Sequence, residues 1–135
     1  MGTWGERAFD NDDAADWADD FVEGDDLSPV EVALDAVAVN DRYVEAPTAW
    51  NALAACEVLA RLLDRAGYRD DTTEAVDEWV ADHAQSPPAD LLSRAVAAID
   101  RILADDSELK ELWAELEEYD QWVAAVTDLR SRVCA

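Results

Sequence analysis

Cysteine, proline, glycine and lysine are all scarce in this sequence. Among 135 residues there are two Cys, four Pro, four Gly and a single lysine, Lys110. Two cysteines cannot form the disulfide framework of a small secreted domain. So few Gly and Pro argue against a turn-rich β-sandwich and against low-complexity disorder. No apolar run reaches the ~18 residues of a membrane span, and the N-terminus lacks the basic and apolar regions of a secretory signal. We therefore expect a cytoplasmic protein.

Basic residues are also few, and this makes the chain strongly acidic. It has 33 Asp and Glu against 10 Lys and Arg, for a formal net charge of -23. Half of the residues are apolar and six are tryptophan, which is enough for a folded core. Nucleic acid and anionic membranes are disfavoured as direct ligands, because the charge repels both. Two interpretations stay open: a surface adapted to a salty cytoplasm, or a surface that attracts a basic partner protein.

Hydrophobic periodicity predicts an all-α protein. Helices are expected from residue 11 or 12 to about 23, and over residues 28–39, 47–66, 73–84, 88–104 and 107–133. Residues 49–63 are alanine-rich and apolar on nearly all sides, which places this helix at the centre of the domain. Glu57 and Arg61, two of its few polar residues, are spaced for an i,i+4 ion pair. We expect one compact domain over residues 1–135, an orthogonal or bundle-like array of about six helices, with an irregular segment of residues 1–11 packing back on it.

Short polar signals mark the helix ends. Asn11 or Asp12 can cap the first helix, and the Ser-Pro-Val-Glu sequence that begins at Ser28 predicts a capping box. Ser107 is expected to cap the last helix. Gly67 is placed to terminate the central helix in the left-handed conformation that glycine favours.

Aspartates crowd the N-terminal region and could bind a divalent cation. The candidate ligands are Asp10, Asp12, Asp13 and Asp16. A helix-loop-helix Ca²⁺ loop that begins at Asp10 fails, because alanines stand at its fifth and sixth positions and a phenylalanine at its twelfth. A looser, weak divalent-cation site remains a hypothesis, and no other cofactor is expected. Helix capping and a solvated helix face explain the same residues.

Three further residues are candidates for binding. His83, the single histidine, lies at helical spacing behind Trp79 and Val80, so it either hydrogen-bonds a neighbour at the edge of the core or borders a small-ligand pocket. Trp4 lies outside every expected helix and is either an anchor for the N-terminus or an exposed contact residue. Phe9 favours the anchor, since it suits a turn that tucks against the core.

No catalytic constellation is readable in the sequence. Gly-rich phosphate loops are absent, and Asp82 and His83 point about 100° apart on a helix, so they are not a preformed dyad. We therefore expect a non-catalytic protein-binding or regulatory protein that acts through an acidic helical surface on a basic protein. The alternative is that the acidity is halophilic-type solvation and the function is small-ligand or divalent-cation binding. The oligomeric state is left open.

Three stretches of the sequence carry a family resemblance. They are Met-Gly-Thr-Trp-Gly at residues 1–5 followed by Phe-Asp-Asn-Asp-Asp-Ala-Ala-Asp-Trp at 9–17, Tyr-Val-Glu-Ala-Pro at 43–47, and Ser-Glu-Leu-Lys-Glu-Leu-Trp at 107–113 with Trp122 and Leu129 downstream. Over nearly its whole length the chain resembles the domain-of-unknown-function 4259 family. It departs at Arg7, where a Gly is typical of members. The resemblance implies a small intracellular helical protein, with no assigned reaction, cofactor or partner.

Overall fold

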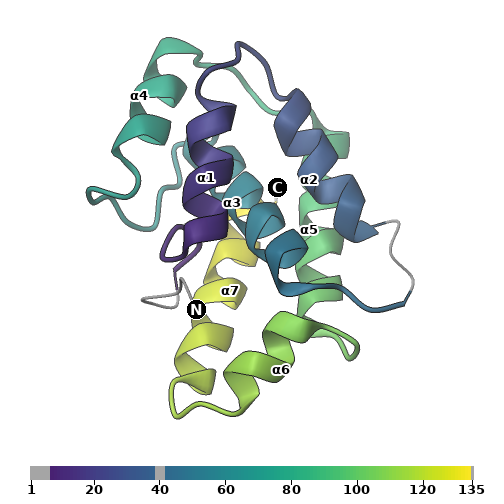
Figure 1. Ribbon diagram of the computed structural model, residues 1–135. Coiled ribbons are helices and arrows are strands. Elements are labelled where there is room, and N and C mark those ends of the chain that lie inside the picture. The colour runs from purple at the N-terminus through teal and green to yellow at the C-terminus, as the bar shows by residue number, and fades with distance from the viewer. Residues whose placement is uncertain (1–6, 39–41, 135) are drawn as a thin grey trace.

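A computed structural model of the protein describes residues 7–38 and 42–134 and is shown in Figure 1. This part of the chain is all-α and contains no strand. Its seven helices are α1 (Asp12–Phe21), α2 (Ser28–Ala38), α3 (Ala46–Leu62), α4 (Glu74–Asp82), α5 (Ala89–Leu103), α6 (Glu108–Ala114) and α7 (Tyr119–Val133). The predicted fold class is confirmed. The described residues hold one helix more than expected, because the last predicted helix is divided into α6 and α7.

Helix α3 lies at the centre of the fold, as its composition predicts. Every residue from Ala52 to Ala60 is buried, and α3 contacts each of the other six described helices. Figure 1 shows α1 to the left of it, α2 and α5 to the right and α7 below. Alanine side chains let neighbouring helices approach closely on several sides, which a helix of larger residues would not allow. The alanine-rich composition is therefore what makes α3 a common packing surface.

Helix α5 supplies the most regular apolar stripe to this core. Its buried residues recur at helical spacing, namely Leu91, Leu92, Ala95, Ala98, Ile99 and Ile102. They face α2, α3 and α7. Each fully buried Leu or Ile stabilises the fold by roughly 1.5–3 kcal/mol relative to an exposed position. None of the helices in the described ranges combines the length and the apolarity that crossing a membrane requires.

Two of the predicted helix caps are present and one is corrected. Asn11 Oδ1 accepts a hydrogen bond of 2.8 Å from the backbone N–H of Ala14, and Ser107 caps α6. Ser28 does not cap α2. It is the first residue of that helix, and its own N–H donates to Asp26 Oδ1 at 3.0 Å. Asp26 therefore satisfies the N–H of Ser28, while the N–H of Glu31, which the Ser side chain was expected to satisfy, donates to the carbonyl of Leu27 at 3.0 Å.

The end of α3 also differs from the expectation. Asp64, with φ 60°, occupies the left-handed position that was assigned to Gly67. The backbone N–H of Arg65 donates to the carbonyl of Ala60 at 2.8 Å, and that of Asp64 donates to the carbonyl of Arg61 at 3.0 Å. These two bonds form a Schellman motif, and Asp is one of the few residues that tolerate this conformation without a glycine.

The break between α6 and α7 has no Gly or Pro. The chain turns over residues 115–118, where the N–H of Leu116 donates to the carbonyl of Trp113 at 2.9 Å and the N–H of Tyr119 to that of Leu116 at 3.2 Å. Three glutamates in this turn repel one another and weaken a continuous helix. The turn also lets the rings of Trp113 and Trp122 stack with centroids 6.2 Å apart. Charge and aromatic packing together divide the predicted helix.

The first turn of α3 depends on α6. Glu45, which precedes α3, makes no side-chain cap. Instead Glu108 Oε1 accepts a hydrogen bond of 2.7 Å from the backbone N–H of Ala46. Val44 pairs with Ser107 in an isolated parallel bridge, which holds the starts of the two helices side by side. A carboxylate at a helix N-terminus interacts favourably with the helix dipole.

Candidate functional site

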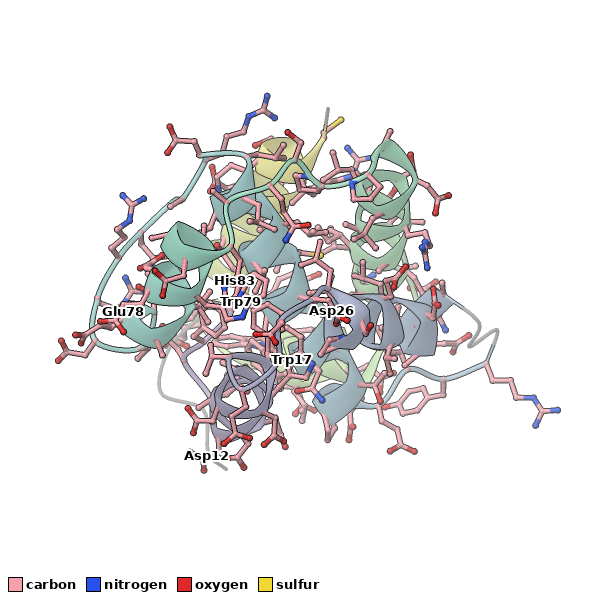
Figure 2. All side chains as sticks on the ribbon, turned by 90° about the horizontal axis from the view of Figure 1, so that it is seen from above. Asp12, Trp17, Asp26, Glu78, Trp79 and His83 are labelled. Carbon is pink, nitrogen blue, oxygen red and sulfur yellow. The ribbon has the colours of Figure 1, made fainter. Side chains whose placement is uncertain are left out.

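The outer side of α1 is a dense row of carboxylates, which we call the acidic face. It comprises the exposed residues Asp12, Asp13, Asp16, Asp19, Asp20 and Glu23. Within residues 7–38 and 42–134, no Arg, Lys or His forms an ion pair with any of them. The neighbouring helix α4 carries the exposed carboxylates Glu74, Glu78 and Asp82. Figure 2 shows Asp12 and Glu78 on the outside of the molecule, on α1 and α4 respectively.

Aromatic rings connect α1 to α4 beneath this charge. Trp17 stacks on Phe21 with centroids 5.2 Å apart, Phe21 meets Trp79 at 4.5 Å, and Trp79 stacks on His83 at 4.2 Å. The indole N–H of Trp79 donates to the carbonyl of Gly24 at 2.8 Å, which fixes the loop after α1. The acidic face therefore rests on a contiguous row of four rings, two stacked pairs that meet at the tilted Phe21–Trp79 contact, of which Trp17, Trp79 and His83 are labelled in Figure 2.

His83 lies at the C-terminal end of α4, half-buried at the edge of the core. Its Nδ1 is 2.9 Å from the carbonyl oxygen of Trp79, and its Nε2 is 3.6 Å from Asp25 Oδ1. The side chain is 28% exposed. The cleft described below does not include it. The contacts of His83 are those of a residue that joins α4 to the loop following α1.

The predicted metal ligands are not brought together. Asp10 is buried, and its carboxylate accepts hydrogen bonds from the Arg7 backbone N–H at 3.3 Å and from Arg7 Nε at 3.2 Å. Asp12, Asp13 and Asp16 are exposed on α1 instead. No three His, Cys, Asp or Glu side chains in the described part of the chain lie close enough to hold a metal ion.

Of the two aromatic residues predicted as binding candidates near the N-terminus, the structure describes Phe9 but not Trp4. The ring of Phe9 is fully buried, and its backbone N–H donates to the hydroxyl of Tyr68 at 3.3 Å. Phe9 thus attaches the first described turn to the core. Trp4 lies outside the described residues.

A buried ion network joins α3 to α4 and α7. At its centre Glu57, 2% exposed, accepts hydrogen bonds from Arg61 and, through both carboxylate oxygens at 3.0 Å, from Arg132 of α7. Arg61 Nε lies 2.8 Å from Asp77 Oδ1 on α4, and Arg132 Nε donates to Asp128 at 2.9 Å. Burying charges is costly unless each is paired and hydrogen-bonded, and here each is.

A second polar cluster surrounds Tyr68. The Arg7 guanidinium lies over the ring at 4.4 Å and pairs with Asp70 at 3.0 Å. Burial, reinforced by the nearby Glu57 carboxylate, raises the pKa of the Tyr68 hydroxyl well above its usual value. A hydrogen bond from the Thr72 hydroxyl, with help from backbone N–H groups and Arg7, lowers the pKa of Asp70. Tyr68 is therefore neutral and Asp70 charged at neutral pH.

Between these two clusters is a cleft, which we call the α7 cleft. Its volume is about 510 Å³. Its lining combines Leu53 and Glu57 of α3, several small and apolar residues of α7, and Arg7, Gly67 and Tyr68. A shallower hollow of about 470 Å³ lies on α4, between Arg69 and Ala81.

Sequence reasoning identified part of this geometry. The i,i+4 spacing of Glu57 and Arg61 in an otherwise apolar helix was the one local signal of the network. Arg132 lies 75 residues from Glu57 in the sequence, and nothing in its own neighbourhood predicts the pairing. Tyr68 and the α7 cleft had no recognisable signal either.

These features define the protein as a compact helical domain with a one-sign acidic face, a buried ion network and a small cleft. The chain belongs to the domain of unknown function family DUF4259, whose model matches residues 2–125. The match includes α1 to α6 and the first part of α7. No curated protein and no solved structure matches the chain significantly.

Proposed function

We propose that this protein is a non-catalytic binding protein whose acidic face engages a basic protein partner. The observation that supports the proposal is the row of exposed carboxylates on α1 and in the turn after it, Asp12, Asp13, Asp16, Asp19, Asp20 and Glu23, which no cation pairs within the described residues. Carboxylates three or four positions apart on a helix repel one another. A cationic partner surface relieves that repulsion, and the field of the whole chain increases its rate of encounter.

The distribution of the basic residues favours binding over simple solvation. One other cluster of carboxylates receives a cation from a neighbouring helix. Arg94 of α5 contacts Glu31 and Asp35 of α2 and Asp90 of its own helix. Within the described residues the acidic face receives no such cation. A surface adapted only to salt does not require this row of carboxylates to be left without a cation, whereas a docking face for a cationic protein does.

The base of the acidic face also suits binding. The contacting rings of Trp17, Phe21 and Trp79 hold α1 on α4, so a partner meets a preformed surface. Little conformational entropy is then lost on association. The chemistry of the Cys56 thiol is consistent with a non-catalytic role, since Cys56 is fully buried and burial raises its pKa strongly.

The proposal is tested by capture of partners from a lysate of the source organism at its own ionic strength. The wild-type chain is compared with the triple variant Asp13→Asn, Asp16→Asn, Asp20→Asn. The matched control is Glu115→Gln, Glu117→Gln, Glu118→Gln, which removes the same charge between α6 and α7, at the opposite end of the molecule from α4 in Figure 1.

We expect a basic protein to be retained by the wild type and the control, and its binding to fall by at least about tenfold in the α1 variant, as loss of several charge pairs predicts. Binding of the purified partner should also weaken with added salt. Equal retention by all three chains, or no retained protein, would refute the proposal and favour solvation as the reason for the acidity.

A further inference from the structure

We infer that the α7 cleft is a binding site for a small, neutral, largely apolar molecule that carries one hydrogen-bond-accepting group. This inference does not depend on the acidic face. Its starting point is the size and lining of the cleft. About 510 Å³ lies within the range of small-molecule pockets, and such pockets combine apolar walls with a few placed polar groups.

The apolar part of the cleft is formed by α3 and α7. Leu53 lines it from α3, and Ala124, Ala125, Val126 and Leu129 line it from α7. Alanine at positions 124 and 125 leaves the space that larger residues of a surface helix would fill. An apolar ring or chain placed there would exclude water from these side chains, which is favourable in proportion to the area covered.

The walls of the cleft are held in place before any ligand arrives. Arg132 is fixed by both oxygens of Glu57 and by Asp128, and Glu57 is also held by Arg61. On the other side, the Tyr68 hydroxyl accepts a hydrogen bond from Phe9, and the Arg7 guanidinium covers the tyrosine ring. A ligand therefore does not have to order these side chains, and that lowers the entropic cost of binding.

The charges of the lining indicate a neutral ligand. Arg7 and Arg132 contribute two positive charges, and Glu57 and Asp128 contribute two negative ones. A charged ligand would lose its hydration without a local charge to compensate it, and an anion would also meet the field of a chain of net charge -23.

Two lining residues have donors to spare. The hydroxyl hydrogen of Tyr68 has no acceptor among the described residues, since Tyr68 Oη is an acceptor in its one hydrogen bond. Arg7 uses Nε for Asp10 and Nη2 for Asp70, which leaves Nη1 without a described partner. A carbonyl oxygen satisfies such donors and carries no net charge. The ligand class is therefore a small aromatic or aliphatic amide, ketone or ester.

Three probes of one shape test this assignment: 2-naphthamide, which is neutral, 2-naphthoate, which is anionic, and 2-naphthamidinium, which is cationic and has no acceptor. Each is titrated into the ¹⁵N-labelled full chain in about 0.5 M NaCl, where charges more than a few ångströms apart are screened. We expect 2-naphthamide to bind most tightly and to shift the amide signals of Gly67, Ala124 and Ala125.

Two variants locate the site. Ala125→Leu fills the cleft and should abolish binding of 2-naphthamide, whereas Ala97→Leu, the same change on the exposed side of α5, should leave it unchanged. Tyr68→Phe removes the hydroxyl and should weaken the amide roughly two- to tenfold. The unfolding midpoint of each variant is measured to confirm that the variant is folded. If Ala125→Leu lowers its midpoint, the affinity of Ala97→Leu for 2-naphthamide still shows whether an added Leu side chain outside the cleft affects binding.

Binding of no probe at millimolar concentration would overturn the inference. So would tighter binding of either ion than of the amide, or an affinity that Ala125→Leu does not change. None of these results bears on the acidic face, because the variants used for partner capture change no residue that lines the α7 cleft.

Discussion

The guanidinium of Arg132 lies directly against the backbone of Gly67. A Cβ atom at position 67 would be 2.7 Å from Arg132 Cζ and 2.9 Å from Nη2, closer than real contacts allow. The conformation of Gly67 is not left-handed, so what requires glycine here is this close approach. Because Gly67 has no side chain, the guanidinium of Arg132 can lie against its backbone and reach Glu57.

Substitution Gly67→Ala should therefore destabilise the fold by displacing Arg132. Its paired bonds to Glu57 are hydrogen bonds between charged groups, whose loss costs about 1.5–3 kcal/mol. Alanine also lowers the conformational entropy of the unfolded chain, which stabilises the fold by about 0.4–1 kcal/mol. We expect a net loss of about 1 kcal/mol in the free energy of unfolding, measured by urea denaturation.

A double-mutant cycle tests the proposed cause. In an Arg132→Met background the guanidinium is gone, so Gly67→Ala should become neutral or slightly stabilising. The same loss in both backgrounds would show that Arg132 is not the reason for the glycine.

The buried network predicts a large effect of a small change at Glu57. Glu57→Gln keeps the shape of the side chain but leaves Arg61 and Arg132 without their shared carboxylate. Removing one member of a buried ion pair costs about 3–5 kcal/mol, because an uncompensated charge stays behind. We expect a loss near the lower limit, since Arg61 keeps Asp77 and Arg132 keeps Asp128.

The matched control is Asp100→Asn, which breaks the exposed Arg130–Asp100 pair with the same carboxylate-to-amide change. Exposed pairs contribute little, so this variant should lose only a small fraction of what Glu57→Gln loses in the same denaturation series. Similar losses in the two variants would contradict a special role of the network.

Acid should remove the contribution that the charged Asp70 side chain makes to the free energy of unfolding. Its pKa is lowered in the fold, first by the Thr72 hydroxyl. A lowered pKa gives stability that is complete above the unfolded value of about 3.9 and is lost as pH falls through the folded value. Thr72→Val should raise the pKa of Asp70 toward the unfolded value, so that the contribution is smaller and its loss is complete at a higher pH. NMR titration of the Asp70 carboxyl carbon measures it. Thr127→Val, on the exposed side of α7, should leave the pKa unchanged.

The acidic face predicts a salt-dependent gain in stability. Asp16 and Asp20 are four positions apart on α1, and like charges at this spacing cost ~0.2–0.5 kcal/mol. Asn at both positions should raise the free energy of unfolding in ~10 mM salt. The gain should vanish near 1 M, where the Debye length is about 3 Å. Asp90→Asn should have the opposite sign in dilute salt, because Asp90 pairs with Arg94. A gain from Asp16→Asn and Asp20→Asn that persists in 1 M salt would exclude an electrostatic cause.

The elements that the sequence predicts correctly are those with a local physical cause. Asn11 and Ser107 cap their helices with their own side chains, and the buried positions of α5 recur at helical spacing. The exposure of the α1 carboxylates likewise follows from the spacing of Ala14, Ala18 and Phe21, which are buried. Each of these features is decided within one or two helical turns.

The features that could not be predicted are decided by residues far apart in the chain. Gly67 resembles a helix terminator in sequence, but the reason for its glycine is Arg132, 65 positions later by residue number. The division of α6 from α7 depends in part on how Trp113 and Trp122 stack, and no Gly or Pro marks it. The lack of ion pairs between the acidic face and any described cation is likewise a property of the packed helices and cannot be read from α1 alone.

The hydrogen bond from Ala46 to Glu108 spans 62 positions of sequence, and this has a consequence for synthesis on the ribosome. The first turn of the central helix receives this acceptor only after Glu108 of α6 has emerged from the exit tunnel. A nascent chain arrested before Glu108 would therefore leave the N–H of Ala46 without this partner and expose the start of α3 to chaperones and proteases.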